Sequence, residues 1–512
     1  MTTTSFGMPP PQILTISAGV HAVAIADPHR PALRVGDRLM TYGEIGTRIR
    51  KVAGAARSLL GRTLGERVVL LAPNCIEYPE IICGLGDLGL VVSTANPRCT
   101  AHELTILARD CEPRLLIVHP SLESVVRAAA LPTVEKIVVL GEEYEAWIAA
   151  GEPCGIDPGL REEDGFALVY TSGTTGEPKG VVLSHRSRVL TFYGMAMEFG
   201  CFGPDDRHLA MAPMAHGAGF AFTMAPLFFG GYVEVLPKFD PEIVLSTLGR
   251  GRFTGTFMVP THYQTIFGLG PATLDRYRNS TPALRSIISN ASALPQSVKE
   301  KIVAYWGEGL LHETYGSTEG GVVTNLRPTD QLRKIQCVGK PFTCTQVRLL
   351  DDQGFEVAPG EVGELHSYSP FLFNGYFRQP DATRESMRDG WLSVGDLARR
   401  DEDGYLYIVD RKKDMVISGG LNIYPREIEE VLHGHASISE AAVVGVPDEQ
   451  WGERLRAFVV ARPGATLDST QIEQHCRKVL AGYKVPREFR IVDALPRGAS
   501  GKVLKNELRK LS

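Results

Sequence analysis

Cysteine is sparse and irregularly spaced in this chain, and its spacing argues against two kinds of framework. The 512 residues contain 9 cysteines, an odd number, and no two of them form a C-x-x-C pair. A disulfide scaffold or a zinc ribbon needs cysteines paired at regular spacing, so neither is expected. The pattern favours reduced thiols in a cytoplasmic protein.

The sequence also lacks an excess of positive charge. Acidic residues number 59 and basic residues 54, which gives a net charge of -5. Proteins that mainly bind nucleic acid usually carry a basic surplus, so we expect no nucleic-acid partner. A local basic patch for a phosphorylated ligand remains compatible with this balance.

Neither a secretory leader nor a membrane span is expected. The first residues, MTTTSFGMPPPQ, lack a basic segment followed by an apolar one. Residues 211–233 carry no formal charge and are numerous enough to cross a bilayer. The same stretch contains two prolines and four glycines, so we expect a buried loop and helix there instead.

The length and the pattern of the first part predict an α/β protein with more than one domain. A single hydrophobic core rarely serves 512 residues. In the first ~150 residues, short apolar runs alternate with helical patterns, as in α/β folds. We predict a helix at 103–111 and strands at 67–71, 115–118, 137–140 and 166–170.

The pattern changes near residue 345. Short strands at 347–350 and 363–365, with a turn at 352–354 between them, suggest a small β-rich region. A charged run at 411–414 follows, and we place the domain boundary there. Beyond it we predict a helix at 425–433 and strands at 440–446 and 455–461.

The strongest motif is the loop from Tyr170 to Gly180, YTSGTTGEPKG, which follows a predicted strand. Its small residues let backbone N–H groups turn toward an anion, and its hydroxyls and Lys179 add further donors. The spacing differs from a Walker A loop. The composition still suits a triphosphate, and a surface loop without a ligand is a poor alternative after a buried strand.

Two other patterns do not predict binding sites. Residues 84–89 fit G-x-G-x-x-G, but these glycines end a helical pattern and precede a strand, whereas a dinucleotide site needs the reverse order. We therefore expect a helix C-terminus and no NAD or NADP binding. His433 and His435 supply only two potential metal ligands, and solvation of a helix end explains them better.

The loop from Tyr170 to Gly180 resembles the phosphate-binding signature of the adenylate-forming superfamily, which includes acyl-CoA synthetases, peptide-synthetase adenylation domains and luciferases. Further segments match that superfamily in order, and the likeness extends from Thr41 to Lys505. The matching segments are 289–295, 315–319, 390–396, 418–422 and 497–502. The chain is identified as a member of this superfamily.

The resemblance implies a fold and a domain division. The expected fold is α/β: a large N-terminal domain of two α/β sheets plus a β-barrel-like part, followed by a small mobile α+β domain. The implied boundaries are 1–410 for the first domain, 411–414 for the hinge and 415–512 for the second domain, which carries a catalytic lysine.

The resemblance also implies a site for ATP. Tyr315 would stack on adenine, Thr318 would contact phosphate, and Glu319 would hold Mg²⁺, roles that suit an aromatic face and a carboxylate. Asp396 would accept hydrogen bonds from both ribose hydroxyls, with Arg411 beside it. The full expected ATP set is Thr171, Ser172, Gly173, Thr174, Thr175, Gly176, Lys179, Asn290, Ala291, Ser292, Tyr315, Gly316, Ser317, Thr318, Asp396, Arg411 and Lys502. Asn290 and Ser292 replace smaller residues that are usual in the superfamily's adenine turn.

Other residues are implied to serve catalysis and the second half-reaction. Lys502 would neutralise charge on the reacting carboxylate and phosphate oxygens, with Thr174 and Glu319 as further catalytic residues. Lys413 matches the hinge. The CoA tunnel would include Gly419 and Gly420, and the acyl pocket His216, Gly217, Gly320 and Gly321.

The implied reaction is an ATP-dependent ligation of a carboxylic acid to CoA. The carboxylate would attack the α-phosphate, release pyrophosphate and form an acyl-adenylate, from which the CoA thiol would displace AMP. The uncharged stretch at 211–233 and the space at Gly320 and Gly321 favour a neutral hydrophobic acid, fatty or aryl, as in fatty acid metabolism. An oligomer is compatible with the sequence.

Several alternatives stay open. A stand-alone adenylation enzyme would pass the acyl group to a carrier protein instead of CoA. An amino-acid adenylation domain usually has an acidic residue in the stretch around His216, and none occurs at 211–233. A luciferase-like oxygenase would emit light. A regulatory nucleotide-binding protein is disfavoured because Glu319 and Lys502 are retained.

Overall fold

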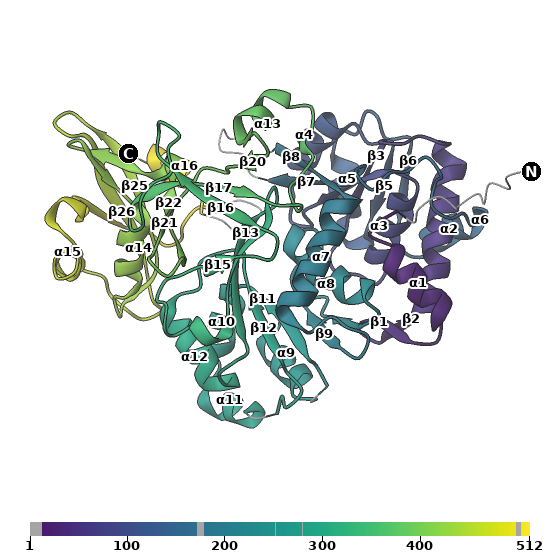
Figure 1. Cartoon of the computed structure of the whole chain (residues 1–512), viewed down its shortest axis with the longest axis horizontal. Coiled ribbons are helices and arrows are strands. Elements are labelled where there is room, and N and C mark those ends of the chain that lie inside the picture. The colour runs from purple at the N-terminus through teal and green to yellow at the C-terminus, as the bar shows by residue number, and fades with distance from the viewer. Residues whose placement is uncertain (1–12, 172–178, 251, 279, 498–502, 512) are drawn as a thin grey trace, which may run out of the picture. The chain divides into compact units, whose positions relative to one another are not determined.

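The computed structural model describes residues 13–511 except 172–178, 251, 279 and 498–502. The described residues form two compact units. The first contains residues 13–171, 179–346 and 368–392, and the second contains residues 347–367 and 393–511. Both units are coloured by residue number in Figure 1.

A seven-stranded sheet in the first unit has the order β18-β8-β7-β4-β3-β5-β6. Strands β7, β4, β3, β5 and β6 run parallel, whereas β8 and β18 are antiparallel to their neighbours. The parallel strands are rich in valine, isoleucine and leucine, as is usual for strands covered on both faces. Their bounds are β3 Arg67–Leu71, β4 Val91–Ala95, β5 Leu115–Val118, β6 Lys136–Val139, β7 Gly165–Thr171, β8 Lys179–Ser184 and β18 Gly375–Tyr376.

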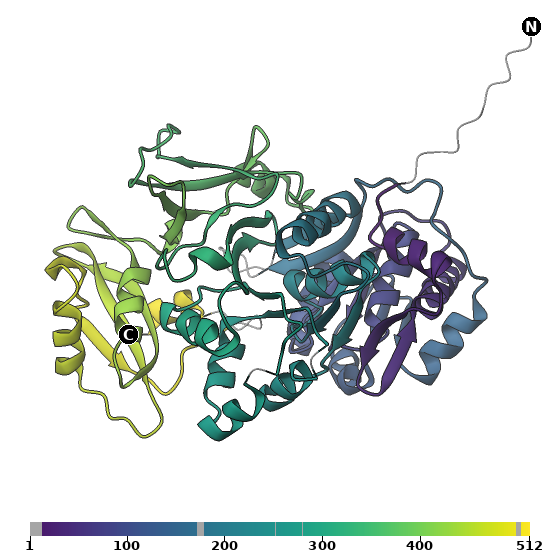
Figure 2. The ribbon, with the colours of Figure 1, turned by 60° about the horizontal axis from the view of Figure 1, so that its bottom comes forward.

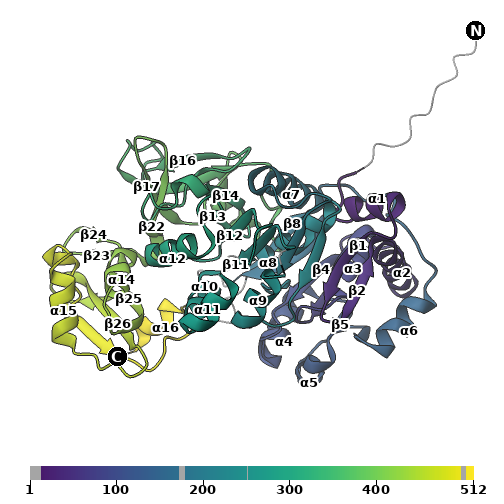
Figure 3. The same ribbon diagram turned by 90° about the horizontal axis from the view of Figure 1, so that it is seen from below.

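A nine-stranded sheet in the same unit has the order β15-β14-β13-β12-β11-β9-β10-β1-β2. Its central strands are parallel, and β2, β14 and β15 are antiparallel. The strand bounds are β1 Pro31–Val35, β2 Arg38–Thr41, β9 Arg207–Ala210, β10 Tyr232–Val235, β11 Gly255–Met258, β12 Ser286–Ser289, β13 Leu311–Ser317, β14 Gly321–Leu326 and β15 Lys340–Pro341. Helices α9, α10 and α12 share a hydrophobic core with this sheet (Figure 3).

The remaining helices of this unit are short or moderate in length, and capping side chains fix several of their ends. Thr41 and Thr100 each form a capping box with the glutamate three residues later, which satisfies backbone N–H groups that the helix leaves unpaired. The helix bounds are α1 Ala18–Ala26, α2 Tyr42–Leu60, α3 Tyr78–Asp87, α4 Ala101–Cys111, α5 Glu123–Ala128, α6 Glu142–Ala150, α7 His185–Phe199, α9 Pro241–Leu248, α10 Pro260–Phe267, α11 Pro271–Tyr277, α12 Gln296–Trp306 and α13 Pro380–Ser386. A small hairpin of β19 (Met387–Arg388) and β20 (Trp391–Leu392) follows α13.

Helix α8 (Gly217–Phe228) contacts both sheets of the first unit. The rings of Phe220 and Phe166, on β7, lie 5.8 Å apart, and Phe222 stacks on Phe257, on β11, at 4.2 Å. A helix that is apolar all round needs cover on every side. The buried loop and helix predicted at 211–233 are therefore confirmed, and among the described helices none combines the length and hydropathy needed to cross a membrane.

The second unit contains two groups of strands. Strands β16 (Gln346–Leu350), β17 (Val362–Tyr368), β21 (Asp396–Arg400) and β22 (Leu406–Arg411) pair in that order. The other group is a sheet of order β24-β23-β26-β25 with β27 beside β26. Its bounds are β23 Val416–Ser418, β24 Leu421–Ile423, β25 Ile438–Asp448, β26 Gly452–Ala461 and β27 Glu488–Ile491.

Helices cover both faces of that second sheet. Helices α14 (Pro425–His433) and α15 (Ser469–Arg477) share one core with it (Figure 2). Leu508 of α16 (Lys505–Lys510) packs with Ala442 and Val444 of β25 in a separate cluster. The expected α/β class, with a small α+β part at the C-terminal end, is confirmed.

Most predicted elements are found close to their predicted bounds. The helix at 425–433 and the strands at 67–71 and 115–118 agree residue by residue, and the other strands shift by up to three residues at an end. The helix predicted at 103–111 begins at Ala101, because its Thr100 cap precedes it. The glycines at 84–89 end helix α3, as predicted. The predicted division at 411–414 falls inside the second unit, and its role as a hinge stays a prediction.

Candidate active site

The predicted phosphate loop connects two neighbouring antiparallel strands. Thr171 ends β7, Lys179 begins β8, and these two residues are register partners in the ladder. Ser172, Gly173, Thr174, Thr175 and Gly176 lie outside the described residues, as does Lys502. The structure therefore fixes both ends of the loop where β7 ends and β8 begins. The predicted contacts of the loop with phosphate stay predictions.

The second predicted motif forms the turn between β13 and β14. Tyr315, Gly316 and Ser317 end β13, and the Gly320 N–H donates to the Ser317 hydroxyl at 2.9 Å. A Cβ on Gly316 would lie only 2.0 Å from the Gly321 carbonyl oxygen, so the turn requires glycine there. This close approach places Thr318 and Glu319 at a tight strand reversal.

Glu319 is held by a tyrosine that the sequence did not predict. The Tyr376 hydroxyl donates to Glu319 Oε1 at 3.0 Å, and the Phe373 N–H donates to the Glu319 carbonyl at 2.8 Å. Lys179 Nζ lies 5.0 Å from the centroid of the Tyr376 ring, within range of a cation–π contact. The pKa of Tyr376 is raised above its ordinary value, mainly by burial and secondly by the negative charge of Glu319. Its hydroxyl therefore remains a donor near neutral pH.

Residues 371–377, here called the bridging segment, tie β8 to the β13–β14 turn. The Asn374 N–H donates to the Val182 carbonyl at 2.9 Å, and the Phe377 N–H donates to the Gly180 carbonyl at 2.8 Å. At the other end, Arg188 of α7 is buried and donates from Nη2 to the Phe371 carbonyl at 2.7 Å. Burial lowers the pKa of Arg188 to about 10, so the guanidinium remains charged at neutral pH.

The predicted adenine turn is built on a buried ion pair. Asn290 Nδ2 donates to the Thr314 hydroxyl at 2.6 Å, just before Tyr315. The Leu294 N–H donates to Glu313 Oε1 at 3.1 Å, and the other carboxylate oxygen pairs with Lys299. Together these contacts fasten both ends of the turn to β13.

The middle of the adenine turn contains a backbone outlier. Ala291 has φ +80°, a region that residues with a Cβ rarely adopt, and its side chain and that of Ser292 are exposed. Strained backbone of this kind persists where surrounding contacts over-determine it, and such positions cluster at ligand sites. The outlier supports a binding role for the turn.

The predicted acyl-pocket residue His216 precedes helix α8, and Gly217 begins that helix. Two buried side chains fix the segment before it. Asn74 Nδ2 donates to the Ala212 carbonyl at 3.2 Å, and the Met214 N–H donates to Asn74 Oδ1 at 2.8 Å. Thr94 Oγ1 donates to the Ala215 carbonyl at 3.0 Å. Sequence reasoning missed both positions, because neither belongs to a motif.

In the second unit the structure brings together the two predicted ribose residues. Asp396 begins β21 and Arg411 ends β22, and the two are register partners. Nearby, Lys412 forms ion pairs with Asp352 at 2.8 Å and Glu364 at 3.0 Å. Lys413, the predicted pivot, is exposed within a short 3₁₀ turn.

The predicted CoA residues lie at the β23–β24 reversal. Gly419 and Gly420 have φ +59° and +80°, which glycine adopts readily. A cavity of about 470 Å³ in the second unit is lined by twelve residues: Ser418, Gly419, Leu421, Trp451, Leu455, Glu473, Arg477, Gly482, Tyr483, Val485, Pro486 and Arg487. The Arg487 guanidinium lies over the Trp451 ring at 4.9 Å. Aromatic faces and arginines in one cavity suit a ligand with a ring and phosphates.

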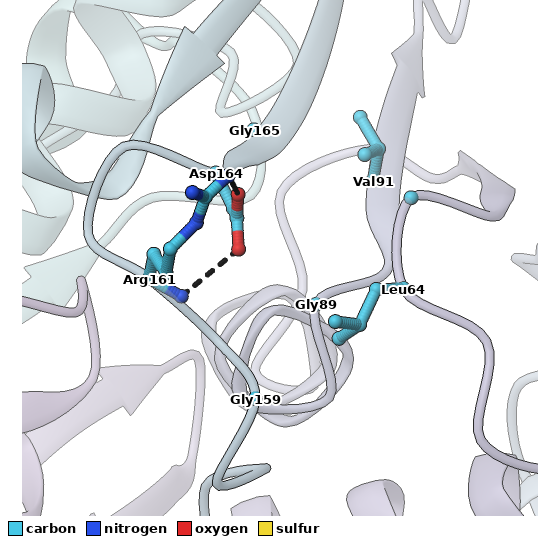
Figure 4. Close-up of a pocket in the computed structure, with 8 residues that line it drawn as sticks. Leu64, Gly89, Val91, Gly159, Arg161, Asp164 and Gly165 are labelled. Atoms are coloured by element: carbon cyan, nitrogen blue, oxygen red, sulfur yellow. Dashed lines mark hydrogen bonds and ion pairs between the residues drawn. The ribbon is translucent and has the colours of Figure 1, made fainter.

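Another cavity, of about 440 Å³, lies in the first unit (Figure 4). Its lining includes Leu64, Gly89, Arg161 and Asp164, and the last two form an ion pair at 3.5 Å. None of the predicted site residues lines it. It is therefore separate from the candidate active site.

Comparison with known protein families agrees with this geometry. A family described as AMP-binding enzyme matches residues 20–377, and the AMP-binding enzyme C-terminal domain matches residues 427–502. A feruloyl-CoA synthase from Amycolatopsis sp is 38% identical over 488 residues, covering 94% of this chain and 96% of the relative. A 2-succinylbenzoate–CoA ligase from Geobacillus kaustophilus is 34% identical over 500 residues, covering 95% of this chain and 96% of the relative.

Solved structures extend the comparison to the fold. ATP-bound MatB from Rhodopseudomonas palustris has a TM-score of 0.87 and 31% identity, covering 96% of this chain and 98% of that one. The o-succinylbenzoate CoA synthetase MenE from Bacillus subtilis, solved with its acyl-adenylate intermediate, has a TM-score of 0.87 and 27% identity, covering 98% of this chain and 99% of that one. The chain belongs to the AMP-binding enzyme family, within the adenylate-forming superfamily, and is an AMP-forming acid–CoA ligase.

Proposed function

We propose that this ligase activates an aromatic monocarboxylate, using ATP with Mg²⁺ and then CoA. One observation supports the first half-reaction, the formation of the acyl-adenylate: Tyr376 contacts both Lys179 and Glu319. A cation beside the predicted phosphate loop and a carboxylate at the β13–β14 turn are the groups that a metal-bound triphosphate needs.

Glu319 fits the role of a Mg²⁺ ligand. Its side chain is buried, Oε1 accepts from Tyr376, and Oε2 accepts no hydrogen bond from any residue that the structure describes. A protein usually holds Mg²⁺ on a nucleotide with one or two carboxylates, while phosphates and water complete the octahedron. When bound, the ion would offset charge on the phosphate oxygens.

Different residues of this chain would have different roles in the first half-reaction. Thr171, Lys179 and the loop between them would hold the β- and γ-phosphates. Asp396 and Arg411 would orient the ribose, and Lys502 would offset negative charge where the carboxylate attacks the α-phosphate. Residues 415–512 would then turn about Lys413, so that the CoA thiol reaches the acyl-adenylate.

The substrate class is supported by the environment of His216 and by one relative. Helix α8 and the segment before it carry no charged residue, and the helix places phenylalanine rings between the two sheets. The feruloyl-CoA synthase relative is named for an aromatic acid. These observations favour an aryl acid over a short polar one.

Arg188 favours a second substrate class, aryl acids that carry a second acidic or oxygen-bearing group. Its buried guanidinium lies near Gly321, a predicted acyl-pocket residue, where a Cβ would be 3.5 Å from Nη2. Its Nε has no hydrogen-bond partner among the described residues. An aryl acid with a second acidic or oxygen-bearing group would supply an acceptor that a plain aryl acid lacks.

The test is an ATP–pyrophosphate exchange assay with matched acids, followed by detection of the thioester. The panel contains benzoic, cinnamic, hydroxycinnamic and carboxy-cinnamic acids, with fatty acids of short, medium and long chains. We expect the aryl acids to give the highest kcat/KM. Preference for a fatty acid would refute the aryl assignment.

The acceptor needs a separate assay, because a fatty acid–[acyl-carrier-protein] ligase from Streptomyces coeruleorubidus is 32% identical to this chain. CoA and a phosphopantetheinylated carrier protein are offered to the same enzyme with the best acid. The cavity lined by Gly419, Trp451 and Arg487 supports CoA as the acceptor. Faster transfer to the carrier protein would refute it.

A further inference from the structure

We infer that Tyr376 is a positioning residue of the adenylation step, which holds the Glu319 carboxylate and the Lys179 ammonium in one fixed arrangement. This inference rests on the proposed function, because it assigns Glu319 to Mg²⁺ and Lys179 to phosphate. Tyr376 belongs to none of the motifs that mark the ATP site. It contacts both groups at once from a third part of the chain.

The hydroxyl of Tyr376 fixes one of the two Glu319 oxygens. A glutamate has three rotatable side-chain bonds, and its carboxylate can turn unless a donor holds it. The 3.0 Å bond from Tyr376 occupies Oε1. The other oxygen, Oε2, is then held in one orientation. A carboxylate fixed in this way can serve as a metal ligand of defined geometry.

The ring of Tyr376 fixes the opposite charge. Lys179 Nζ lies 5.0 Å from the ring centroid, and no ion pair of Lys179 with a described residue is present. A direct Lys179–Glu319 ion pair would satisfy both charges without ATP and would have to break when ATP binds. By giving each charge a separate partner, Tyr376 leaves both free for the nucleotide.

The backbone around Tyr376 is rigid enough for this role. Gly375 and Tyr376 pair with Val182 and Val181 of β8 as an antiparallel bridge. Phe373 donates to the Glu319 carbonyl, so the bridging segment bonds to Glu319 through both backbone and side chain. Arg188 holds the start of this segment through the Phe371 carbonyl. The segment thus fixes the distance between the strand that carries Lys179 and the turn that carries Glu319.

The alternative is that Tyr376 only packs. Its ring lies 5.0 Å from the Phe373 ring in an edge-to-face arrangement. Tyr376→Phe keeps that packing and the ring face under Lys179 but removes the hydroxyl. Tyr376→Leu removes both. The two variants therefore separate the hydroxyl from the ring.

The experiment measures Mg²⁺-dependent ATP binding by calorimetry, without acid, in wild type, Tyr376→Phe and Tyr376→Leu. Since a hydrogen bond to a charged group is lost, Tyr376→Phe should raise the Mg²⁺ concentration for half-maximal ATP binding by about tenfold. The leucine variant should lose more. Tyr305→Phe is the control, because it removes a tyrosine hydroxyl that donates to the Leu274 carbonyl, outside the site.

A double-mutant cycle with Glu319→Gln tests whether Tyr376 acts through Glu319. We expect Tyr376→Phe to have no further effect on Mg²⁺ dependence in the Glu319→Gln background. Thioester formation from pre-formed acyl-adenylate and CoA, and the melting temperature, should remain at the wild-type level in Tyr376→Phe.

Three results would overturn the inference: unchanged Mg²⁺ dependence in Tyr376→Phe, additive effects in the cycle, or parallel loss of stability and of both half-reactions. Binding of ATP is read without any acid. A failure of the proposed substrate class would therefore leave this test intact and would appear only in the exchange assay.

Discussion

Asp396 and Arg411 face each other across the first pair of the β21–β22 ladder, and Arg411 Nε lies 3.2 Å from Asp396 Oδ1. The aspartate is buried, whereas the arginine side chain is 42% exposed. A carboxylate has two oxygens and about four acceptor positions, so one that pairs with a guanidinium can also accept from hydroxyl groups. This arrangement suits the predicted ribose role of Asp396 and Arg411, which stays a prediction.

The first prediction concerns ribose recognition by Asp396. Asp396→Asn keeps the shape of the side chain but replaces one acceptor oxygen by a donor. We expect ATP to bind about tenfold more weakly, because a hydrogen bond to a charged group is lost. The wild type should discriminate against 2′-deoxy-ATP, and the variant should lose most of that discrimination.

Calorimetric titration with both nucleotides measures this effect. Asp352→Asn is the matched control, because Asp352 is an exposed carboxylate of the same unit that pairs with Lys412. If Asp396→Asn discriminates between the two nucleotides as strongly as the wild type does, Asp396 does not bind the ribose.

The second prediction concerns the backbone of Ala291. A β-branched residue is strongly disfavoured at its φ of +80°, so Ala291→Val should reduce the free energy of unfolding by about 1–2 kcal/mol and weaken ATP binding. Ala291→Gly should be tolerated in both respects. Urea denaturation and nucleotide titration are the measurements. Ala293→Val, at an exposed neighbour whose φ is not positive, should change neither, and an equal loss there would contradict the strain argument.

The third prediction concerns acid stability and His208. This residue is fully buried against phenylalanine rings, and burial lowers its pKa to about 3. An unfolded histidine has a pKa of about 6.5, so below that pH the unfolded state binds the extra proton and stability is lost as the pH falls. Keeping His208 neutral should therefore lower the free energy of unfolding of the wild type by about 2 kcal/mol at pH 5 and by almost nothing at pH 8. His208→Leu should remove this pH-dependent loss of stability.

Urea denaturation of wild type and His208→Leu at both pH values measures this difference. His29→Leu provides the control, because it makes the same replacement at an exposed position. A stability difference between His208→Leu and wild type that is the same at pH 5 and pH 8 would show that His208 is not held neutral by burial.

The sequence predicted most of the local structure, and it pointed to site residues in compact motifs, whose roles stay predictions. The helix at 425–433 was predictable because its apolar residues repeat with helical spacing, and the strand that ends at Thr171 because its apolar residues form a short buried run. Tyr376 was missed because it lies 57 residues from Glu319 along the chain. Asn74 was missed for the same reason, since its partner Met214 is 140 residues away. Contacts of this kind depend on how the strands pair, which no local pattern encodes.

The fourth prediction concerns the hinge at Lys413. Proline there fixes φ near about -65° and restricts Lys412, the residue before it. We expect Lys413→Pro to retain acyl-adenylate formation, because Lys413 lies in a 3₁₀ turn, and the usual φ of such turns, about -50 to -70°, includes the value that proline fixes. Thioester formation should fall by orders of magnitude, because the turned state becomes unreachable.

Both half-reactions are measured on one preparation, with circular dichroism as the check of folding. Lys412→Ala is the control, because it removes a neighbouring lysine without restricting the backbone. Thioester formation at the wild-type rate in Lys413→Pro would show that Lys413 is not the pivot.

The most direct test of the central claim follows one oxygen atom. The acid is labelled with ¹⁸O in its carboxylate and incubated with the enzyme, ATP, Mg²⁺ and CoA. The masses of the products are then measured by mass spectrometry. If the carboxylate attacks the α-phosphate and CoA then displaces AMP, one labelled oxygen must leave in each AMP and none in pyrophosphate. Label in inorganic phosphate together with ADP, or thioester formed with unlabelled AMP, would contradict the acyl-adenylate mechanism.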